Sequence, residues 1–534
     1  MRTLRTSAFC CVARGLATLL AIGAAAAASA QTSYKQTSFH EVQVFSGLVN
    51  PTAVRFLPDG SVLVAEKSGL IKKFDTLTST TPSIVADFRT AVHNFWDRGL
   101  LGLAIDPNFS SNHFVYVLYT YNAIPGGAAP RWVASGGDPT SDPCPTPPGA
   151  TTDGCVVQGH LSRLTAVGTS WTASEQILIQ DWCQQFPSHS VGSMAFGADG
   201  MLYVTGGEGA SFDNADWGQF GGTQGVPPVT PANPCGDPPF PATNPETKPT
   251  AEGGALRAQS PRRTPGEPRV LNGSLLRLDP ATGAAAPGNP MGGSGDPDEQ
   301  RIIGFGFRNP FRMIVKPGTN DVWVADVGWN TWEEINRVPD HSVARNFGWP
   351  CFEGNSTQYT GLNICPTQAQ TTAPYFLYNH GAQVTAGDGC PTGSSSVAGM
   401  AFYGGASNYP SSYNNALFFS DYSRHCVWVM LPGTGGDPNP ANVIPFASGA
   451  QGPVDLQIGP DGNVYYSDFD GGKIWRIEYG PIAVASGNPT GGPTPLTVNF
   501  SSTGSLPAQP GDTITYAWDL DGDGQYDDST LPNP

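Results

Sequence analysis

The chain has 534 residues, of which 66 are glycine, 50 are proline and only 13% are charged. This composition argues against long helices and favours many short strands with turn-rich connections. About 500 residues also exceed one ordinary core, unless the fold is a repeat or a large β architecture. The formal net charge of -17 argues against nucleic acid or anionic lipid as a partner. It suits an exported protein that acts on a neutral substrate.

Residues 1–30 have the pattern of a secretory signal. Arg2 and Arg5 precede an alanine-rich apolar run that ends in Ala28-Ser29-Ala30. A basic start, an apolar run and small residues at its end predict cleavage after Ala30. A membrane anchor is the alternative, but the run is short for one, and no later segment has the roughly 18 uncharged apolar residues that a span needs. We therefore predict a secreted or periplasmic protein without a membrane span.

Eight cysteines lie outside the signal segment, and no two of them form a Cys-x-x-Cys motif. An even count in an exported chain predicts disulfides, and the irregular spacing argues against a zinc site. Spacing alone does not prove a connectivity. Pairing of nearest neighbours would join Cys144 to Cys155, Cys183 to Cys235, Cys351 to Cys365 and Cys390 to Cys426.

A weak repeat recurs along the chain, made of an apolar strand, a turn such as Pro-Asp-Gly, a second strand and then a third. The first two strands are predicted at residues 56–66, 196–205, 315–326 and 458–467. The third is predicted at residues 68–75, 272–279 and 472–477. Recurrence of such units with variable spacing is typical of a β-propeller with loop insertions. An array of β-sandwiches explains the strands but not the recurring order of turn residues.

Two segments interrupt the repeat, at residues 123–155 and 211–268. Both are rich in proline, glycine, alanine and threonine, and both contain cysteines that would pin the loops. We interpret them as surface decoration; shaping the mouth of a pocket is the alternative.

The composition changes after Tyr479, where residues 481–494 resemble a linker. Strands are predicted at residues 495–501 and 513–518. Residues 519–528 then place carboxylates at alternating positions around glycines, as in a calcium loop, although the complete twelve-residue pattern is missing. A plain acidic turn is the alternative.

Residues 302–338 draw attention because they combine two predicted strands, joined by a turn, with polar and aromatic groups at both outer ends. This is how a sheet presents side chains at its rim. Distinctive motifs lie within this stretch and elsewhere in the chain. They are RGLLGLA at residues 98–104, His189 followed by FGADGMLY at residues 196–203, RNP at residues 308–310, WEEIN at residues 332–336 and NFGWPCFEG at residues 346–354.

Together these motifs resemble the soluble glucose/sorbosone dehydrogenase family over about residues 38–480. The resemblance implies an all-β, six-bladed β-propeller that binds pyrroloquinoline quinone and calcium. The tail is similar to the start of a PKD domain, an immunoglobulin-like β-sandwich. The expected organisation is a signal peptide at residues 1–30, the propeller at residues 31–480, and a linker with a partial PKD-like domain at residues 481–534.

His189 matches the catalytic base of the family. A neutral imidazole is the natural base near pH 7 for removing a hydroxyl proton. The residues alone, without the resemblance, favour a solvent-facing loop histidine. Glu208 lies where the family commonly has aspartate, which helps to orient the histidine.

The resemblance also implies cofactor contacts. A quinone with three carboxylates needs cations and amide donors, and Arg308 and Asn309 match these contacts; a structural rim arginine is the alternative. Asp97 falls where the family has a polar contact, and Arg424 falls near an expected lysine. The backbone carbonyls of Gly328 and Trp329 match calcium ligands. They complete the set of candidate site residues.

The chain departs from the family before Asp455, where Gly452 and Val454 replace two arginines that clasp the cofactor in some members. The predicted function is oxidation of an aldose sugar or related polyol, with electrons passed to an external acceptor. The alternative is a non-catalytic carbohydrate-binding or surface-interaction propeller, whose tail would contact polysaccharide or a cell surface. A hydrolase is disfavoured, because Glu333 and Glu334 are adjacent on a strand and point to opposite faces.

Overall fold

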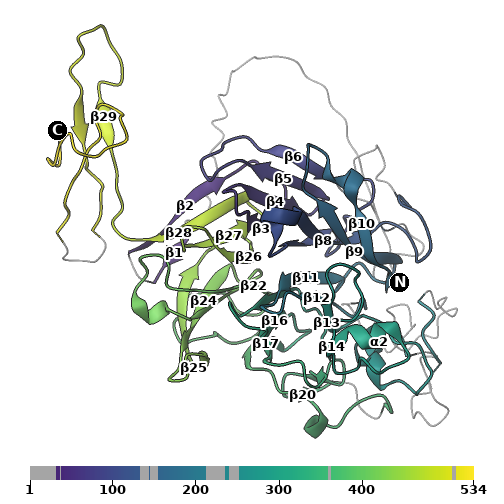
Figure 1. Ribbon diagram of the computed structural model, residues 1–534. Coiled ribbons are helices and arrows are strands. Elements are labelled where there is room, and N and C mark those ends of the chain that lie inside the picture. The colour runs from purple at the N-terminus through teal and green to yellow at the C-terminus, as the bar shows by residue number, and fades with distance from the viewer. Residues whose placement is uncertain are drawn as a thin grey trace, which may run out of the picture. The chain divides into compact units, whose positions relative to one another are not determined.

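The computed structural model describes residues 32–35, 38–132, 144, 154–211, 235–239, 252–358, 362–507 and 513–534. The predicted signal segment lies outside these residues, as do large parts of both predicted insertions. The expected all-β, six-bladed propeller is confirmed, with six sheets arranged around a common axis (Figure 1). Each blade has four antiparallel strands, counted from the axis outward.

The first three blades follow chain order. Blade 1 contains β3 (Pro51–Phe56), β4 (Val62–Glu66), β5 (Leu70–Phe74) and β6 (Ser83–Asp87). Blade 2 contains β7 (Leu100–Ile105), β8 (Phe114–Tyr121), β9 (Val157–Thr165) and β10 (Gln176–Gln184). Blade 3 contains β11 (Val191–Phe196), β12 (Leu202–Gly206), β13 (Ser274–Leu278) and β14 (Ile302–Phe305).

The other three blades complete the ring. Blade 4 contains β15 (Arg312–Val315), β16 (Val322–Asp326), β17 (Trp332–Val338) and β21 (Phe376–Asn379). Blade 5 contains β22 (Val397–Phe402), β23 (Leu417–Asp421), β24 (Cys426–Pro432) and β25 (Pro438–Ser448). Blade 6 contains β26 (Pro453–Ile458), β27 (Val464–Asp468), β28 (Lys473–Tyr479) and β2 (Phe39–Phe45).

Short elements decorate the blades. β1 (Ser33–Tyr34) extends blade 5, β18 (Arg345–Asn346) pairs in parallel with β14, and β19 (Phe352–Glu353) pairs with β20 (Ser356–Thr357). The helical elements are α1 (Phe109–Asn112), η2 (Trp171–Ser174), η3 (Gly254–Arg262), α2 (Pro297–Arg301), η4 (Gln368–Gln370) and η5 (Ser411–Tyr413). None of the helices in the described part of the chain is long and apolar enough to cross a lipid bilayer.

The ring is closed by strands from the two ends of the propeller sequence. β2 forms the outer strand of blade 6 and runs antiparallel to β28, with Phe39 opposite Tyr479 and Gln43 opposite Trp475. Phe39 and Phe45, at the two ends of β2, are both buried. This pairing removes two free sheet edges and ties the first blade to the last.

The predicted repeat corresponds to the inner strands of blades 1, 3, 4 and 6. Its turn glycines, Gly60, Gly200, Gly318 and Gly462, have φ values of 86°, 74°, 73° and 79°. These angles lie in the left-handed region, which explains why glycine recurs there. The repeat was not recognised in the sequences of blades 2 and 5. There, longer connections at residues 106–113 and 403–416 replace the tight turn between the first two strands.

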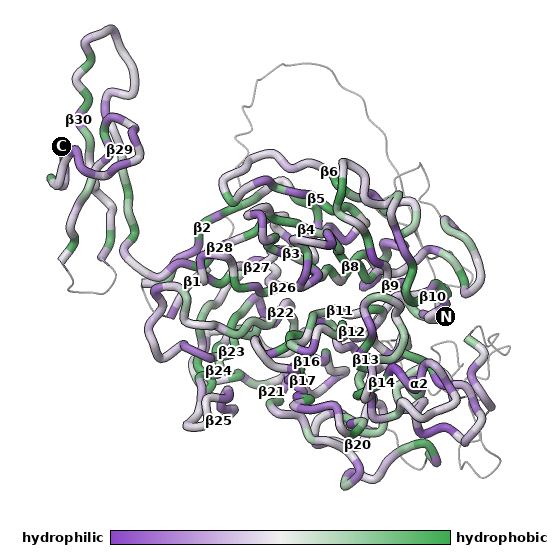
Figure 2. The backbone as a smooth tube through the Cα atoms, in the orientation of Figure 1, coloured by the Kyte–Doolittle hydropathy of each residue, from purple (hydrophilic) through white to green (hydrophobic). Residues whose placement is uncertain are grey.

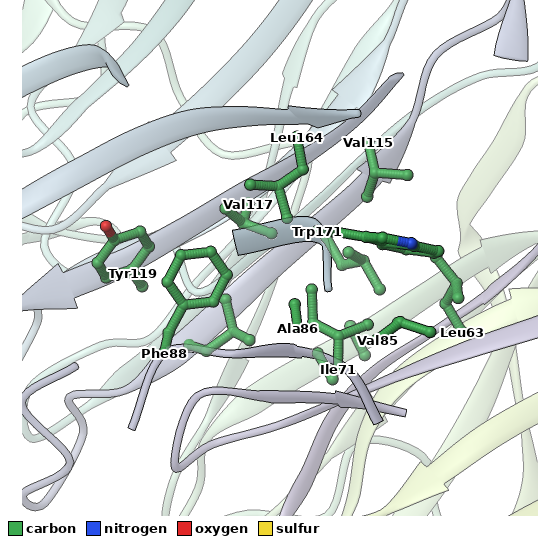
Figure 3. Close-up of a cluster of buried hydrophobic side chains, with 14 of the residues drawn as sticks. Leu63, Ile71, Val85, Ala86, Phe88, Val115, Val117, Tyr119, Leu164 and Trp171 are labelled. Atoms are coloured by element: carbon green, nitrogen blue, oxygen red, sulfur yellow. The ribbon is translucent and has the colours of Figure 1, made fainter. Parts of the chain in front are cut away.

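The hydrophobic core is divided among the six interfaces between neighbouring blades, each with its own buried cluster. Figure 3 shows the cluster between blades 1 and 2, where Ile71 and Val85 face Val117, Leu164 and Trp171. Figure 2 colours the strands by hydropathy, and central strands such as β4 (VLVAE) and β16 (VWVAD) are buried along their whole length. Both faces of each sheet are covered, so packing between blades holds the ring together.

All four nearest-neighbour disulfides are confirmed. They join Cys144 to Cys155, Cys183 to Cys235, Cys351 to Cys365 and Cys390 to Cys426. The Cys183–Cys235 bond anchors the second predicted insertion to β10 of blade 2, whereas the Cys144–Cys155 bond closes a loop within the first insertion, just before β9. The Cys390–Cys426 bond fastens the loop before β22 to the start of β24.

The tail contains less regular structure than its sequence predicts. β29 (Ser486–Asn488) pairs with β30 (Asn499–Ser501). The strand predicted at residues 513–518 is wrong in extent: only Trp518 forms a bridge, to Ser529. A strand exists only where a partner completes its ladder, and here a single residue does so. The PKD-like sandwich remains a prediction.

The acidic end of the tail brings Asp519, Asp521 and Asp528 together, with one ligand oxygen of each within 4.8 Å of the others. Backbone N–H groups of Gly522 and Gly524 donate to Asp519 at 2.7 and 3.0 Å. These bonds are those of an acidic turn, and they leave the choice between a turn and a calcium loop open.

Candidate functional site

A cavity of about 550 Å³ lies where the inner strands of all six blades begin. The inner strands are β3, β7, β11, β15, β22 and β26. Near the start of each inner strand, one residue lines the cavity. In chain order these residues are Thr52, Asp97, His189, Arg308, Ser396 and Val454. Five of the candidate residues therefore meet in one place, namely Asp97, His189, Arg308, Asn309 and Gly328.

Irregular pairing aims several side chains into this cavity. Five of the six inner strands have a register shift near their start. The residues passed over by these shifts include Thr52, Leu101, Ala398 and Val454, and all four line the cavity. In a regular strand these side chains would pack against the neighbouring blade. A bulge redirects them toward the cavity. Bulges that recur at the start of the inner strands therefore place several of the side chains that line the cavity.

His189 is held in a tight loop beside Glu208. Its backbone φ is 49°, and Gly209 donates its N–H to the His189 carbonyl at 2.9 Å. A Cβ on Gly207 would lie 2.3 Å from that carbonyl oxygen, so only glycine allows the two backbone segments to lie this close. The His189 Nδ1 and Glu208 Oε1 atoms are 2.5 Å apart, and the two residues are only 3% and 1% exposed.

The environment keeps the His189 imidazole neutral near pH 7. Burial lowers its pKa well below the ordinary range, and the Arg308 cation lowers it further. Burial also raises the pKa of Glu208 to about 8. Below about pH 8, the protonated Glu208 would donate to Nδ1 and leave the ring hydrogen on Nε2. Once Glu208 is ionised, as the pH rises past about 8, the Nδ1–H group donates to it, and Nε2 carries the lone pair. This is the tautomer that a proton acceptor in the cavity requires.

Arg308 and Asn309 are fixed by Asp326 at the end of β16. The Asp326 carboxylate accepts the backbone N–H of Arg308 at 3.1 Å and that of Asn309 at 2.7 Å. The Arg308 guanidinium donates to the carbonyls of Val327 and Gly328, at 3.1 and 2.6 Å. The two outer ends of the stretch at residues 302–338 therefore meet in space.

Glu353 organises the loop that carries the predicted calcium ligands, and sequence reasoning missed this role. Its Oε1 atom accepts four backbone N–H groups, those of residues 329–332, at 2.8, 3.0, 3.0 and 3.2 Å. Because these amides point toward Glu353, the Gly328 and Trp329 carbonyls point away from it. Gly328 lines the cavity, whereas Trp329 is not among its lining residues. The NFGWPCFEG motif contains Glu353, but nothing local in it reveals this partner.

Lys67 is a second residue that sequence reasoning missed. It follows β4 directly, lines the cavity, and donates from Nζ to Asn94 Oδ1 at 2.5 Å. Burial lowers its pKa to about 8, opposed by the Asp97 carboxylate. Residues just after the second strand of other blades, such as Val327, Tyr422 and Phe469, also line the cavity. The position of Lys67 directly after the second strand of its repeat could therefore have predicted that it lines the cavity.

Arg424 is not among the residues that line the cavity. It is fully buried, and its guanidinium donates to the carbonyls of Asn379, His380 and Ala382, at 2.8, 3.1 and 2.8 Å. These bonds tie blade 5 to the loop after β21. The expectation that Arg424 contacts a cofactor gains no support from this placement.

Asp97 and the two glutamates of β17 have different surroundings. Ser188 donates to Asp97 Oδ2 at 3.2 Å, beside His189 in the cavity. Glu333 accepts from Val397 N at 2.8 Å and contacts His380 at 2.7 Å. Glu334 accepts from Gly354 N at 2.6 Å. Both glutamates brace loops outside the cavity lining, which removes the basis for a hydrolase.

The cavity wall at Val454 presents an apolar side chain. Some family members carry arginines in this region. Val454 lines the cavity, and its carbonyl accepts from Arg312 Nε at 2.9 Å. Arg312 also donates to the carbonyls of Thr52 at 2.6 Å and Leu101 at 3.3 Å. This buried guanidinium therefore links the inner strands of blades 1, 2, 4 and 6 beneath the cavity.

Comparison with known proteins places the chain in the glucose/sorbosone dehydrogenase family, to which it belongs: the family model matches residues 48–225 and 255–476. The HIPL2 protein of Arabidopsis thaliana is 25% identical over 378 residues, covering 68% of this chain and 48% of that protein. The aldose sugar dehydrogenase YliI of Escherichia coli (strain K12) is 28% identical over 229 residues, covering 42% of this chain and 55% of that protein. The chain thus spans about half the length of these curated relatives.

Solved structures share the fold. An oxidoreductase described as a glucose dehydrogenase, from Thermus thermophilus, matches with a TM-score of 0.53 and 24% identity, covering 82% of this chain and 100% of that one. The PQQ-bound form of aldose sugar dehydrogenase from Streptomyces coelicolor matches with a TM-score of 0.51 and 18% identity, covering 82% and 98%. The likeness to these structures supports the fold described above.

Proposed function

We propose that this protein catalyses the quinone-dependent oxidation of an aldose sugar or a related polyol. The observation that carries the proposal is the neutral His189 imidazole, held by Glu208 in a cavity that also contains Arg308 and Asn309. The signal-like residues 1–30 and the four disulfides support a secreted or periplasmic location.

The donor set of the cavity fits a ligand that carries carboxylates. The Arg308 guanidinium and the Asn309 amide are suited to bind and orient carboxylates of pyrroloquinoline quinone, and Asp97 offers a polar contact. The carbonyls of Gly328 and Trp329 are the proposed calcium ligands. The Gly328 carbonyl already accepts from Arg308 at 2.6 Å, and a carbonyl oxygen has two lone pairs to share between partners.

A bound quinone supplies the hydride acceptor for the reaction. His189 would take the proton of the sugar hydroxyl at Nε2, while the carbon of the same C–OH group loses its hydride. Glu208 would hold the ring so that Nε2 faces the substrate and would stabilise the imidazolium that forms. The oxidised sugar leaves, and the two electrons pass to an external acceptor.

Reconstitution with pyrroloquinoline quinone and calcium tests the proposal. The loaded protein should reduce a dye acceptor in the presence of some aldose from a panel of sugars. His189→Ala should lower kcat by roughly 10² to 10⁴-fold, the usual contribution of a general base. His40→Ala serves as the control, because His40 pairs with Glu478 on blade 6, away from the cavity. Normal turnover in the His189 variant would contradict the assigned mechanism.

A non-catalytic carbohydrate-binding or surface-interaction propeller is the second candidate. The apolar Val454 in the cavity wall, where a clasping cation was expected, favours it. Contact of the tail with polysaccharide or a cell surface belongs to the same candidate. Titration with pyrroloquinoline quinone distinguishes the two, because a ligand that binds the folded state raises the melting temperature. No shift at saturating quinone would favour the binding propeller.

A further inference from the structure

The cavity contains two cations that come from opposite sides of the ring. Lys67 follows β4 of blade 1, and Arg308 precedes β15 of blade 4. In the ring order of inner strands, blades 1 and 4 are three positions apart among six. The two cations therefore approach the cavity from opposite walls, separated along the chain by the whole of blades 2 and 3.

Neither cation has a carboxylate partner. Within the described residues, no carboxylate oxygen lies within ion-pair distance of Lys67 or Arg308, although many other basic residues are paired. The nearby Lys72, for example, lies 2.6 Å from Glu66. Lys67 donates to the neutral amide of Asn94, and Arg308 donates to carbonyls. The Asp97 carboxylate acts on Lys67 only from beyond ion-pair distance. A partly buried cation without a direct carboxylate partner is costly, and such groups are typical of anion-binding sites.

The floor of the cavity adds positive charge on the side of Val454. Arg312 lies beneath it, and the nearest carboxylate is Asp455, at 3.9 Å. That carboxylate is shared with Arg55, which approaches it to 2.7 Å. Two arginines thus face one aspartate below the wall that Gly452 and Val454 leave without a cation. The guanidinium of Arg312 donates to the carbonyls of Thr52, Leu101, Phe311 and Val454, so it acts on the cavity through its charge.

We propose that Lys67 is a ligand-binding residue that pairs with one carboxylate of a polycarboxylate in this cavity, while Arg308 binds another from the opposite wall. The inference deepens the proposed function and rests on it when the polycarboxylate is the quinone cofactor. Lys67 then supplies the cation that the family pattern leads one to expect at Arg424, Gly452 or Val454. The ligand class is a rigid molecule with carboxylates on at least two sides.

The test compares charge-removing variants of Lys67 in the full-length protein. Pyrroloquinoline quinone is titrated in calcium-containing buffer, and its dissociation constant is read from absorbance and from the melting-temperature shift. Lys67→Met should weaken binding by about tenfold or more, the value expected for a charge-assisted hydrogen bond. Lys67→Arg should stay near wild type, and the control Lys73→Met removes a surface lysine paired with the exposed Asp75.

A purely structural role of Lys67 predicts another pattern. Lys67→Gln keeps a donor for Asn94 but removes the charge, so it should lose affinity as Lys67→Met does if the charge binds ligand. Bound quinone should also protect the Lys67 amine from reductive methylation, measured by mass spectrometry. Unchanged affinity in Lys67→Met and Lys67→Gln overturns the inference, whether or not their stability falls.

A second probe separates this inference from the proposed function. If the wild-type protein does not bind the quinone, the proposed function fails, and benzene-1,2,4-tricarboxylate replaces the quinone in the same series. Loss of its stabilising effect in Lys67→Met and Lys67→Gln, but not in Lys73→Met, would still support Lys67 as a carboxylate-binding residue. Equal effects in all variants, or no binding of either probe, would overturn it.

Discussion

Glu208 Oε1 lies 2.5 Å from Nδ1 of His189, although the whole β11–β12 hairpin separates the two residues in the chain. The contact depends on Gly207, which lets the two loops approach. Because both side chains are buried, the protonation of one sets the hydrogen-bonding role of the other. This pair leads to a prediction about stability.

Replacing Glu208 with glutamine should flatten the pH dependence of stability between about pH 6.5 and 8. Burial raises the pKa of Glu208 from its ordinary value of 4.5 to about 8. The folded protein therefore keeps a proton that the unfolded chain releases, and this contribution to stability is lost as the pH rises through the folded pKa. Below pH 6.5, the lowered pKa of His189 opposes the trend, because the unfolded imidazole then gains a proton first.

The measurement is urea unfolding at pH 6.5 and at pH 8. Relative to Glu208→Gln, the wild-type protein should lose roughly 1 to 2 kcal/mol of unfolding free energy over this interval. Asp75→Asn, which removes an exposed carboxylate, should follow the wild type. Parallel curves for wild type and Glu208→Gln would show that Glu208 is ionised throughout the range.

Replacing Glu353 with alanine should disorder the loop that carries the Gly328 carbonyl. Four backbone N–H groups lose their common acceptor, so the unfolding free energy should fall by about 2 to 3 kcal/mol. Any rise in melting temperature caused by calcium should also shrink, because the carbonyls are no longer oriented.

Thermal unfolding with and without calcium chloride checks this prediction. Glu334→Gln is the matched control: it alters another buried glutamate of the same region, whose acceptor bond goes to Gly354 instead of the loop. It should lower the melting temperature without selectively reducing the calcium effect. An undiminished calcium effect in Glu353→Ala would show that Glu353 does not orient the metal ligands.

Replacing Arg312 with methionine should destabilise the whole ring. The carbonyls of Thr52, Leu101 and Val454 would lose a buried donor, and Asp455 would lose a nearby cation. We expect a loss of roughly 3 kcal/mol or more in unfolding free energy. Arg89→Met breaks the exposed pair with Asp87 and should cost less than about 1 kcal/mol. Similar midpoints in urea for both variants would contradict the linking role of Arg312.

The candidate site was only partly predictable from sequence. Resemblance pointed to Arg308, Asn309 and His189, and the structure brings them into one cavity. Lys67 follows a strand of the repeat at a position that lines the cavity in other blades, yet no local motif marked it. Arg424 was expected near a family lysine, but it is not among the residues that line the cavity, and its guanidinium donates to Ser395 Oγ and to the carbonyls of Asn379 and Ala382. The position of a long side chain in the sequence does not predict the direction in which it points in the fold.

The sequence by itself determined the features that depend on neighbouring residues. The strands and the turn glycines such as Gly60 follow from local pattern, because short segments of chain limit each of them. The spacing of the cysteines suggested the disulfide pairing without proving it. Only the tertiary structure decided which distant groups meet. Ring closure through β2 and β28 brings the first and last blades together, and the bulges at the start of the inner strands turn Thr52 and Val454 toward the cavity. The opposition of Lys67 and Arg308, and the loop held by Glu353, are consequences of that closed geometry.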